Sequence, residues 1–250
     1  MVSFRNVYTG NNRRMEHLTT VGVYAFASGI TILIGGLLSS LDRFPESIMK
    51  ERVLHSIVAF GGGVLIAAVA FVLTPRAIEL LSMASLVLYF LLGAGVFFII
   101  DRKISRSGKP VAQLMAMLMD FIPEAIALGA AFAHDKNFGL LLAIFIGLQN
   151  LPEGFNSFKE LVAKGISPNK ALLILLPLSL TGVLASCLGF IFLNNQPVVI
   201  ASLMLFAGGG IIYLTFQDIA PMSAMKNQWS PALGASLGFL VGMIGQKILG

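Results

Sequence analysis

Long apolar stretches and short polar breaks alternate along the whole chain. A helix needs ~20 apolar residues to cross the hydrocarbon core of a bilayer. Eight stretches reach that length, and the breaks between them hold proline, glycine, asparagine or charged clusters. The pattern predicts an all-α polytopic membrane protein with eight transmembrane helices, at about residues 18–40, 53–74, 80–100, 111–133, 138–158, 171–193, 198–219 and 231–249.

The breaks are too short for a soluble domain, so we interpret residues 1–250 as one transmembrane domain. Arg5, Arg13 and Arg14 precede the first apolar stretch, as basic residues precede a signal peptide. That stretch is longer than the apolar part of a signal peptide, about 7–15 residues. We therefore expect it to remain as the first helix. Pro75 is expected to end the second helix, because proline interrupts helical hydrogen bonding.

Composition and charge support a membrane protein. Hydrophobic residues make up 56% of the chain and charged residues 12%, against about 25% charged residues in soluble domains. The net charge of +5 lies in the loops, without the basic stripe and interleaved aromatics of a nucleic-acid-binding surface. With the N-terminus outside, 11 of the 17 Lys and Arg residues face the cytoplasm. We predict a plasma (inner) membrane location, with both termini outside and the bilayer as partner; a homodimer is compatible with this.

Acidic residues interrupt two neighbouring helices. Asp120 and Glu124 are four residues apart, so both lie on one face of the fourth helix. Gln149 and Glu153 have the same spacing in the fifth helix, and Asn150 adjoins Gln149. A carboxylate at membrane depth is costly and usually functional. We predict one shared polar site that contains all five residues.

Pro123 and Pro152 strengthen this prediction, because each frees a backbone carbonyl that can turn toward a cavity. Three carboxylates placed together repel one another. A divalent cation offsets that repulsion, and clustered oxygens suit such an ion. The ion is expected as the substrate, with no cofactor. Gln217 and Asp218, just before Pro221, are candidates for an exit path, while Asp218 as a solvated helix-end residue is the alternative.

An internal repeat joins the second and seventh helices. Phe60 is followed by three glycines and, fifteen residues on, by Pro75. Phe206 is followed by Ala207 and three glycines, and fifteen residues after it comes Pro221. The two helices run in opposite directions in the predicted topology. This predicts an inverted repeat of helices one to three and six to eight around helices four and five. Close helix packing is the alternative explanation for the glycines alone.

With these residues in place, the chain resembles the ZIP (Zrt/Irt-like) family of divalent metal transporters. The fifth helix carries the most specific motif: residues 149–154 read Gln-Asn-Leu-Pro-Glu-Gly, where the family has His or Gln, two residues, then Pro-Glu-Gly. In the fourth helix Asp120 stands at the family's His position and Phe121 at its Asn position. The segment Gln217 to Pro221 is similar to the family's His-Glu-Leu/Ile-Ile-Pro.

The resemblance implies a metal site between helices four and five, formed mainly by Asp120, Glu124, Gln149 and Glu153, with Asn150 contributing to a second metal. The glutamate that the family often has in helix six is missing from residues 179–189. The resemblance implies uptake of divalent metal into the cytoplasm by alternating access, with zinc as the default. An all-oxygen site favours Mn²⁺ or Fe²⁺ more than the family's usual site does.

Two other functions stay open at this stage. The carboxylates could relay protons in a carrier of another solute, or the chain could sense metal without transporting it. Enzymatic activity is not expected, because the sequence lacks a phosphate loop, a His-Glu-x-x-His motif and a nucleophile elbow. An intramembrane aspartyl protease built on Asp120 and Glu153 would need an atypical glutamate in its dyad.

Overall fold

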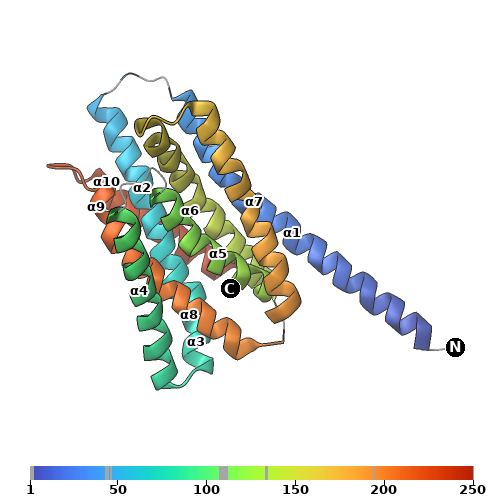
Figure 1. The fold of residues 1–250 in the computed structure, drawn as a ribbon. Helices are drawn as coiled ribbons and strands as arrows, with labels where there is room; N and C mark the ends of the chain where they lie inside the picture. The colour runs from blue at the N-terminus through green and yellow to red at the C-terminus, as the bar shows by residue number, and fades with distance from the viewer. Residues whose placement is uncertain are drawn as a thin grey trace.

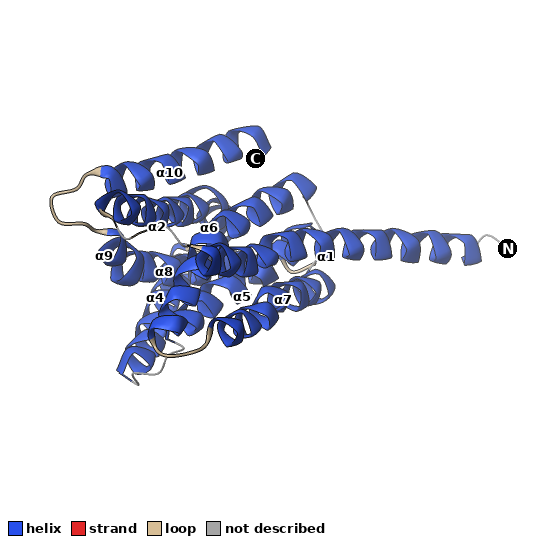
Figure 2. Ribbon diagram, turned by 90° about the horizontal axis from the view of Figure 1, so that it is seen from above, coloured by secondary structure: helices blue, strands red, loops and turns tan. Residues whose placement is uncertain are grey.

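The computed structural model describes residues 3–42, 45, 47–106, 112–132, 135–193 and 195–249. Every regular element among them is a helix (Figure 2), which confirms the predicted all-α fold. The elements shown in Figure 1 are α1 Ser3–Leu41, α2 Ile48–Ala68, η1 Val69–Leu73, α3 Thr74–Leu80, α4 Met83–Arg106, α5 Ala112–Phe132, α6 Lys136–Ala163, α7 Pro168–Leu193, α8 Pro197–Leu214, η2 Thr215–Ile219, α9 Ala220–Ser223 and α10 Ser230–Leu249.

Seven helical segments within the described residues are long and apolar enough to cross a membrane, and they coincide with seven of the predicted spans: Glu16–Leu41, Ile48–Leu80, Met83–Ile104, Lys136–Ala163, Pro168–Leu193, Pro197–Ser223 and Ser230–Leu249. The eighth predicted span, 111–133, forms the 21-residue helix α5. Its predicted first and last residues lie outside the described residues.

The second helix does not end at Pro75, so that prediction was wrong. The chain stays helical from α2 through the π-helical turn η1 and the short helix α3, as far as Leu80. A proline inside an α-helix removes a donor and clashes with the carbonyl four residues earlier. The wider turn just before Pro75 accommodates that break, and the Thr74 hydroxyl donates to the Val69 carbonyl. The seventh helix likewise continues through η2 past Pro221 to Ser223.

The packing of α2 and α8 confirms the inverted repeat. Each π-helical turn begins nine residues after the phenylalanine of its motif, Phe60 or Phe206. A β-carbon on Gly238 of α10 would lie 2.0 Å from the Phe60 carbonyl oxygen. A β-carbon on Gly93 of α4 would lie 1.9 Å from the Phe206 carbonyl oxygen. The α2–α10 and α8–α4 pairs are therefore equivalent contacts, made by small residues that let two backbones meet.

The same correspondence extends to the other helices. A β-carbon on Gly154 of α6 would lie 2.1 Å from the Ile32 carbonyl oxygen of α1. On Gly129 of α5 it would lie 1.8 Å from the Ser186 carbonyl oxygen of α7. The pair α1–α6 thus repeats as α7–α5, and α5 and α6 are repeat mates. Counting back five residues from Gly129 and Gly154 makes Glu124 the mate of Gln149.

The helices pack in two groups. One contains α1, α5, α6 and α7, and the other contains α2 with α3, α4, α8 with α9, and α10. The groups meet mainly where α2 lies against α6 and where α8 lies against α5. Thus α1 and α7 pack with the two central helices rather than forming one unit with α2, α4, α8 and α10.

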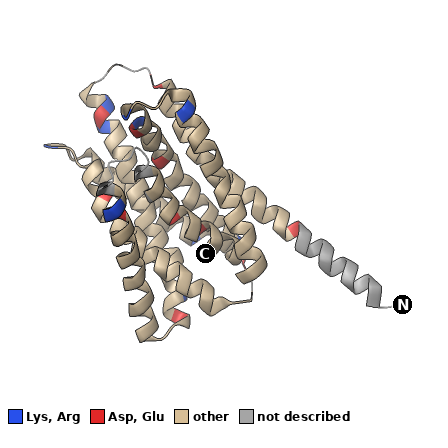
Figure 3. Ribbon diagram, viewed as in Figure 1, with Lys and Arg blue, Asp and Glu red and all other residues tan. Residues whose placement is uncertain are grey.

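Charged residues mark the ends of the bundle, while acidic residues also occur inside it (Figure 3). Where α1 ends, Asp42 accepts ion pairs from Lys50 of α2 at 3.0 Å and Lys159 of α6 at 3.5 Å. The pair with Lys50 therefore joins the two groups at one end of the molecule, while the pair with Lys159 ties the end of α1 to α6 within the first group.

Candidate metal-binding site

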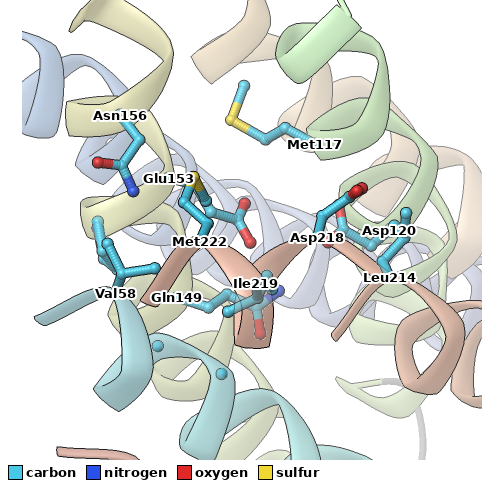
Figure 4. A pocket seen from close by; sticks show the side chains of 13 residues that line it. Val58, Met117, Asp120, Gln149, Glu153, Asn156, Leu214, Asp218, Ile219 and Met222 are labelled. Carbon is cyan, nitrogen blue, oxygen red and sulfur yellow. The ribbon is translucent and has the colours of Figure 1, made fainter. Parts of the chain in front are cut away.

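A cavity of about 30 Å³ lies where the two helix groups meet (Figure 4). A water molecule occupies about 30 Å³ in the liquid, so the space suits one water or one small ion. The first group supplies the side chains that carry most of the oxygen atoms; the second supplies the glycines of α2 and one end of α8–α9. The lining residues are Val58, Gly61, Gly62, Met117, Asp120, Gln149, Pro152, Glu153, Asn156, Leu214, Asp218, Ile219 and Met222.

Three of the five predicted site residues line this cavity. Asp120 comes from α5, and Gln149 and Glu153 lie one turn apart on α6. Asp120 is only 3% exposed, and its Oδ1 accepts the Phe121 backbone N–H at 2.8 Å. The Oε2 atom of Glu153 is buried without a hydrogen-bond partner. The cavity thus contains a carboxylate oxygen that lacks the partner buried charges normally require.

Glu124 joins the site through a hydrogen bond and does not line the cavity itself. The Gln149 side-chain amide donates to Glu124 Oε2 at 2.5 Å, and both residues are 1% exposed. The second oxygen of each group, Glu124 Oε1 and Gln149 Oε1, is buried without a partner. This bond connects the repeat mates of α5 and α6. The Pro-Glu pairs of the two helices are therefore alike in sequence without being equivalent in space.

Asn150 faces a different neighbour. Its amide donates to the Ser28 carbonyl of α1 at 3.2 Å, its Oδ1 has no partner, and the side chain is fully buried. It does not line the cavity. The structure therefore places Asn150 next to the site, oriented by α1, with one acceptor oxygen still unused.

The two exit-path candidates lie in different surroundings. Asp218 lies on η2 and lines the cavity, whereas its neighbour Gln217 is exposed and does not. In the second helix group, the Tyr213 hydroxyl donates to Asp101 Oδ2 at 2.8 Å.

Sequence reasoning missed Met117 and Met222 as lining residues, because single methionines in apolar helices are usually packing residues. Asn156, one turn beyond Glu153 on α6, also lines the cavity.

These residues offer oxygen atoms without gathering into a tight cluster. Within the part of the chain that the structure describes, no three His, Cys, Asp or Glu side chains stand close enough together to hold a metal ion. Four carboxylate or amide oxygens on α5 and α6 nevertheless lack partners, those of Glu124, Gln149, Asn150 and Glu153, as does the Ser157 hydroxyl of α6. The ion pairs found among the described residues involve residues near helix ends. An oxygen-rich, uncompensated site of this kind suits a hard or borderline divalent cation.

Known proteins match about half of this chain. The family model described as ZIP zinc transporter matches residues 111–249, which is more than half of the chain. The zinc transporter GufA of Myxococcus xanthus is 27% identical over 139 residues, 55% of each protein. Zinc transporter ZIP13 of Gallus gallus is 24% identical over 133 residues, 52% of this chain and 36% of the relative. The aligned segment thus spans about half or less of each of these relatives. The chain belongs to the ZIP zinc transporter family.

Proposed function

We propose that this protein carries divalent metal cations across the membrane into the cytoplasm, binding them between α5 and α6. The observation that carries this proposal is the set of four unpartnered carboxylate and amide oxygens on these helices. Small rotations of the Gln149 and Glu153 side chains would turn their own oxygens toward Asp120 across the cavity. A cation bound there would supply the partner that the buried oxygens of Gln149 and Glu153 lack.

The proposed substrate follows from the ligand type. Carboxylate and amide oxygens bind Mn²⁺ and Fe²⁺ well, while Zn²⁺ gains more from nitrogen or sulfur ligands. Asp120 stands at the family's histidine position and removes a nitrogen ligand. The matched relatives are named zinc transporters. We therefore propose Zn²⁺ as a substrate together with Mn²⁺ and Fe²⁺, with weaker discrimination among them than a histidine-containing site would give.

The proposed mechanism is alternating access between the two helix groups. The cavity lies on their boundary, where Gly61 of α2 approaches Pro152 of α6 so closely that a β-carbon would lie 3.0 Å from its ring. Relative motion of the groups would expose the same ligands first to one side and then to the other. In this proposal both termini lie outside the plasma membrane. The membrane potential, negative inside the cell, then favours the inward movement of positive charge that is not compensated.

Purified protein in liposomes tests the proposal. Uptake of labelled Zn²⁺, Mn²⁺ and Fe²⁺ should fall about 10-fold or more in Glu153→Gln, because even indirect changes at metal sites cost 10–100-fold. Glu160→Gln is the control, since Glu160 lies on the same helix but pairs with Lys164 near its end. Unchanged uptake in Glu153→Gln would show the metal site to be elsewhere. Metal that binds without crossing would favour a sensor, and uptake of another solute driven only by a pH gradient would favour the proton-coupled carrier.

A further inference from the structure

The inverted repeat relates each residue of the cavity to a residue on the opposite face of the bundle. These related residues would line a cavity that opens on that face. The mates of Asp120, Glu153 and Asn156 are Phe145, Leu128 and Ala131, counted from the equivalent glycines Gly154 and Gly129. All three mates are buried and apolar. The half of the bundle opposite the cavity is therefore packed shut, although the same pair of helices forms both halves.

A mate on α3 is charged rather than apolar. Met222, at the α9 end of the cavity, lies sixteen residues after Phe206, and Arg76 lies sixteen residues after Phe60. α3 and α9, which carry these mates, lie toward opposite ends of the bundle (Figure 1). Arg76 lines a separate cleft of about 240 Å³, together with Met204, the mate of cavity-lining Val58. Arg76 thus lies beside a cleft between α3 and α8, within the second helix group.

Arg76 also joins the two helix groups through contacts with Asp135 and Phe138. Its guanidinium lies 3.7 Å from Asp135 Oδ2, and its Cζ lies 4.1 Å from the centre of the Phe138 ring. Asp135 also caps α6, because its Oδ1 accepts the backbone N–H groups of Asn137 and Phe138 at 3.0 and 3.1 Å. One side chain of α3 therefore holds the first turn of α6, the helix that carries Gln149 and Glu153.

We infer that Arg76 is the gate residue of this opposite face. Its contacts with Asp135 and Phe138 hold α6 against α3 and close the apolar half while the cavity side is open. Opening the opposite face requires α6 to move away from α3, so these contacts must break in every cycle. An arginine facing an entering cation would repel it, and releasing the gate removes that obstacle from the path. The inference rests on the proposed alternating access, since a gate needs two states to separate.

Two cysteine reporters test the gate without any metal. Cys187 is the only cysteine in the sequence, so a Cys187→Ala background is free of thiols. Ala131→Cys reports on the closed half, and Asn156→Cys reports on the cavity. In detergent, where both faces are accessible, Arg76→Gln and Asp135→Asn should each raise the labelling rate of Ala131→Cys by about 3- to 10-fold, as expected for a part-exposed ion pair with a cation–π contact. The same variants should lower the labelling rate of Asn156→Cys, because one state gains population at the expense of the other.

The controls separate gating from loosening. Asp135→Asn keeps a good helix cap, because asparagine caps about as well as aspartate, so its effect comes from the lost charge. Lys136→Gln removes an exposed charge next to Asp135 and should leave both rates unchanged. Equal increases at both reporters would mean general loosening and would overturn the gate, as would unchanged rates in Arg76→Gln and Asp135→Asn. If metal uptake fails in every variant while the reciprocal labelling persists, the gate stands and the proposed function is wrong.

Discussion

Replacing Gly63 by alanine tests the helix packing on which the repeat assignment depends. An added β-carbon would lie 2.0 Å from the Ala235 carbonyl oxygen of α10, against the 3.4 Å at which ordinary contact begins. Both neighbours are helix backbone, so α2 and α10 must separate by more than an ångström. Overpacking of this kind costs about 1–3 kcal/mol. At roughly 2–4 °C per kcal/mol for a chain of this length, the thermal midpoint should fall on the order of 5 °C.

The assay is loss of the monodisperse peak in detergent after heating, followed by size-exclusion chromatography. Gly209 is the repeat mate of Gly63, and a β-carbon there would lie 2.1 Å from the Phe90 carbonyl oxygen of α4. The thermal midpoint of Gly209→Ala should therefore fall by a similar amount. Gly95→Ala is the matched control, because no atom lies within 4 Å of an added β-carbon there. That exchange should stabilise its helix by about 0.5–1 kcal/mol. If Gly63→Ala proves as stable as Gly95→Ala, the backbone contact between α2 and α10 is wrong.

Two further predictions concern other buried or bridging groups. Gln149→Leu leaves Glu124 buried without its donor and should cost about 1.5–3 kcal/mol, the value of a hydrogen bond to a charged group, measured as the same thermal midpoint. Gln217→Leu, at an exposed position, should leave that midpoint unchanged. Asp42→Asn removes the acceptor for Lys50 and Lys159 and should destabilise the protein by about 1–3 kcal/mol, because the Asp42 and Lys50 side chains are only 10% and 11% exposed and a buried group would lose its partner. Salt screens a mostly buried pair only weakly, so a loss that disappears between 20 and 500 mM salt would contradict the burial of this pair.

Hydrophobic length was sufficient to predict the helices, because membrane thickness and backbone hydrogen bonding leave few alternatives. The repeat was also visible, since Phe60 and Phe206 stand at the same spacing from their prolines. The continuation of the helix beyond Pro75 was not visible in the sequence, because a π-helical turn has no residue signature and arises from the surrounding packing.

At the site, helix periodicity puts Asp120, Gln149 and Glu153 on helix faces that line one cavity in the structure. Periodicity fixes the face of a helix but not the partner that a side chain selects. Asn150 adjoins Gln149 in sequence yet binds the Ser28 carbonyl, a contact 122 residues away along the chain. Sequence similarity between the two Pro-Glu pairs also gave no hint that Glu124 and Gln149 are the spatial mates, because that relation depends on glycines that touch other helices.

The hydrogen bond between Gln149 and Glu124 joins two residues that the repeat exchanges. Such a bond lies on the pseudo-two-fold axis of the molecule, the line that stays in place when the two halves trade conformations. The candidate ligands therefore sit at the pivot of any such exchange, where displacement is smallest. Identical acidic or amide residues at the two positions would place two carboxyl groups or two amides across this axis. One acid and one amide instead give the pivot a donor, an acceptor and a single ionisable group.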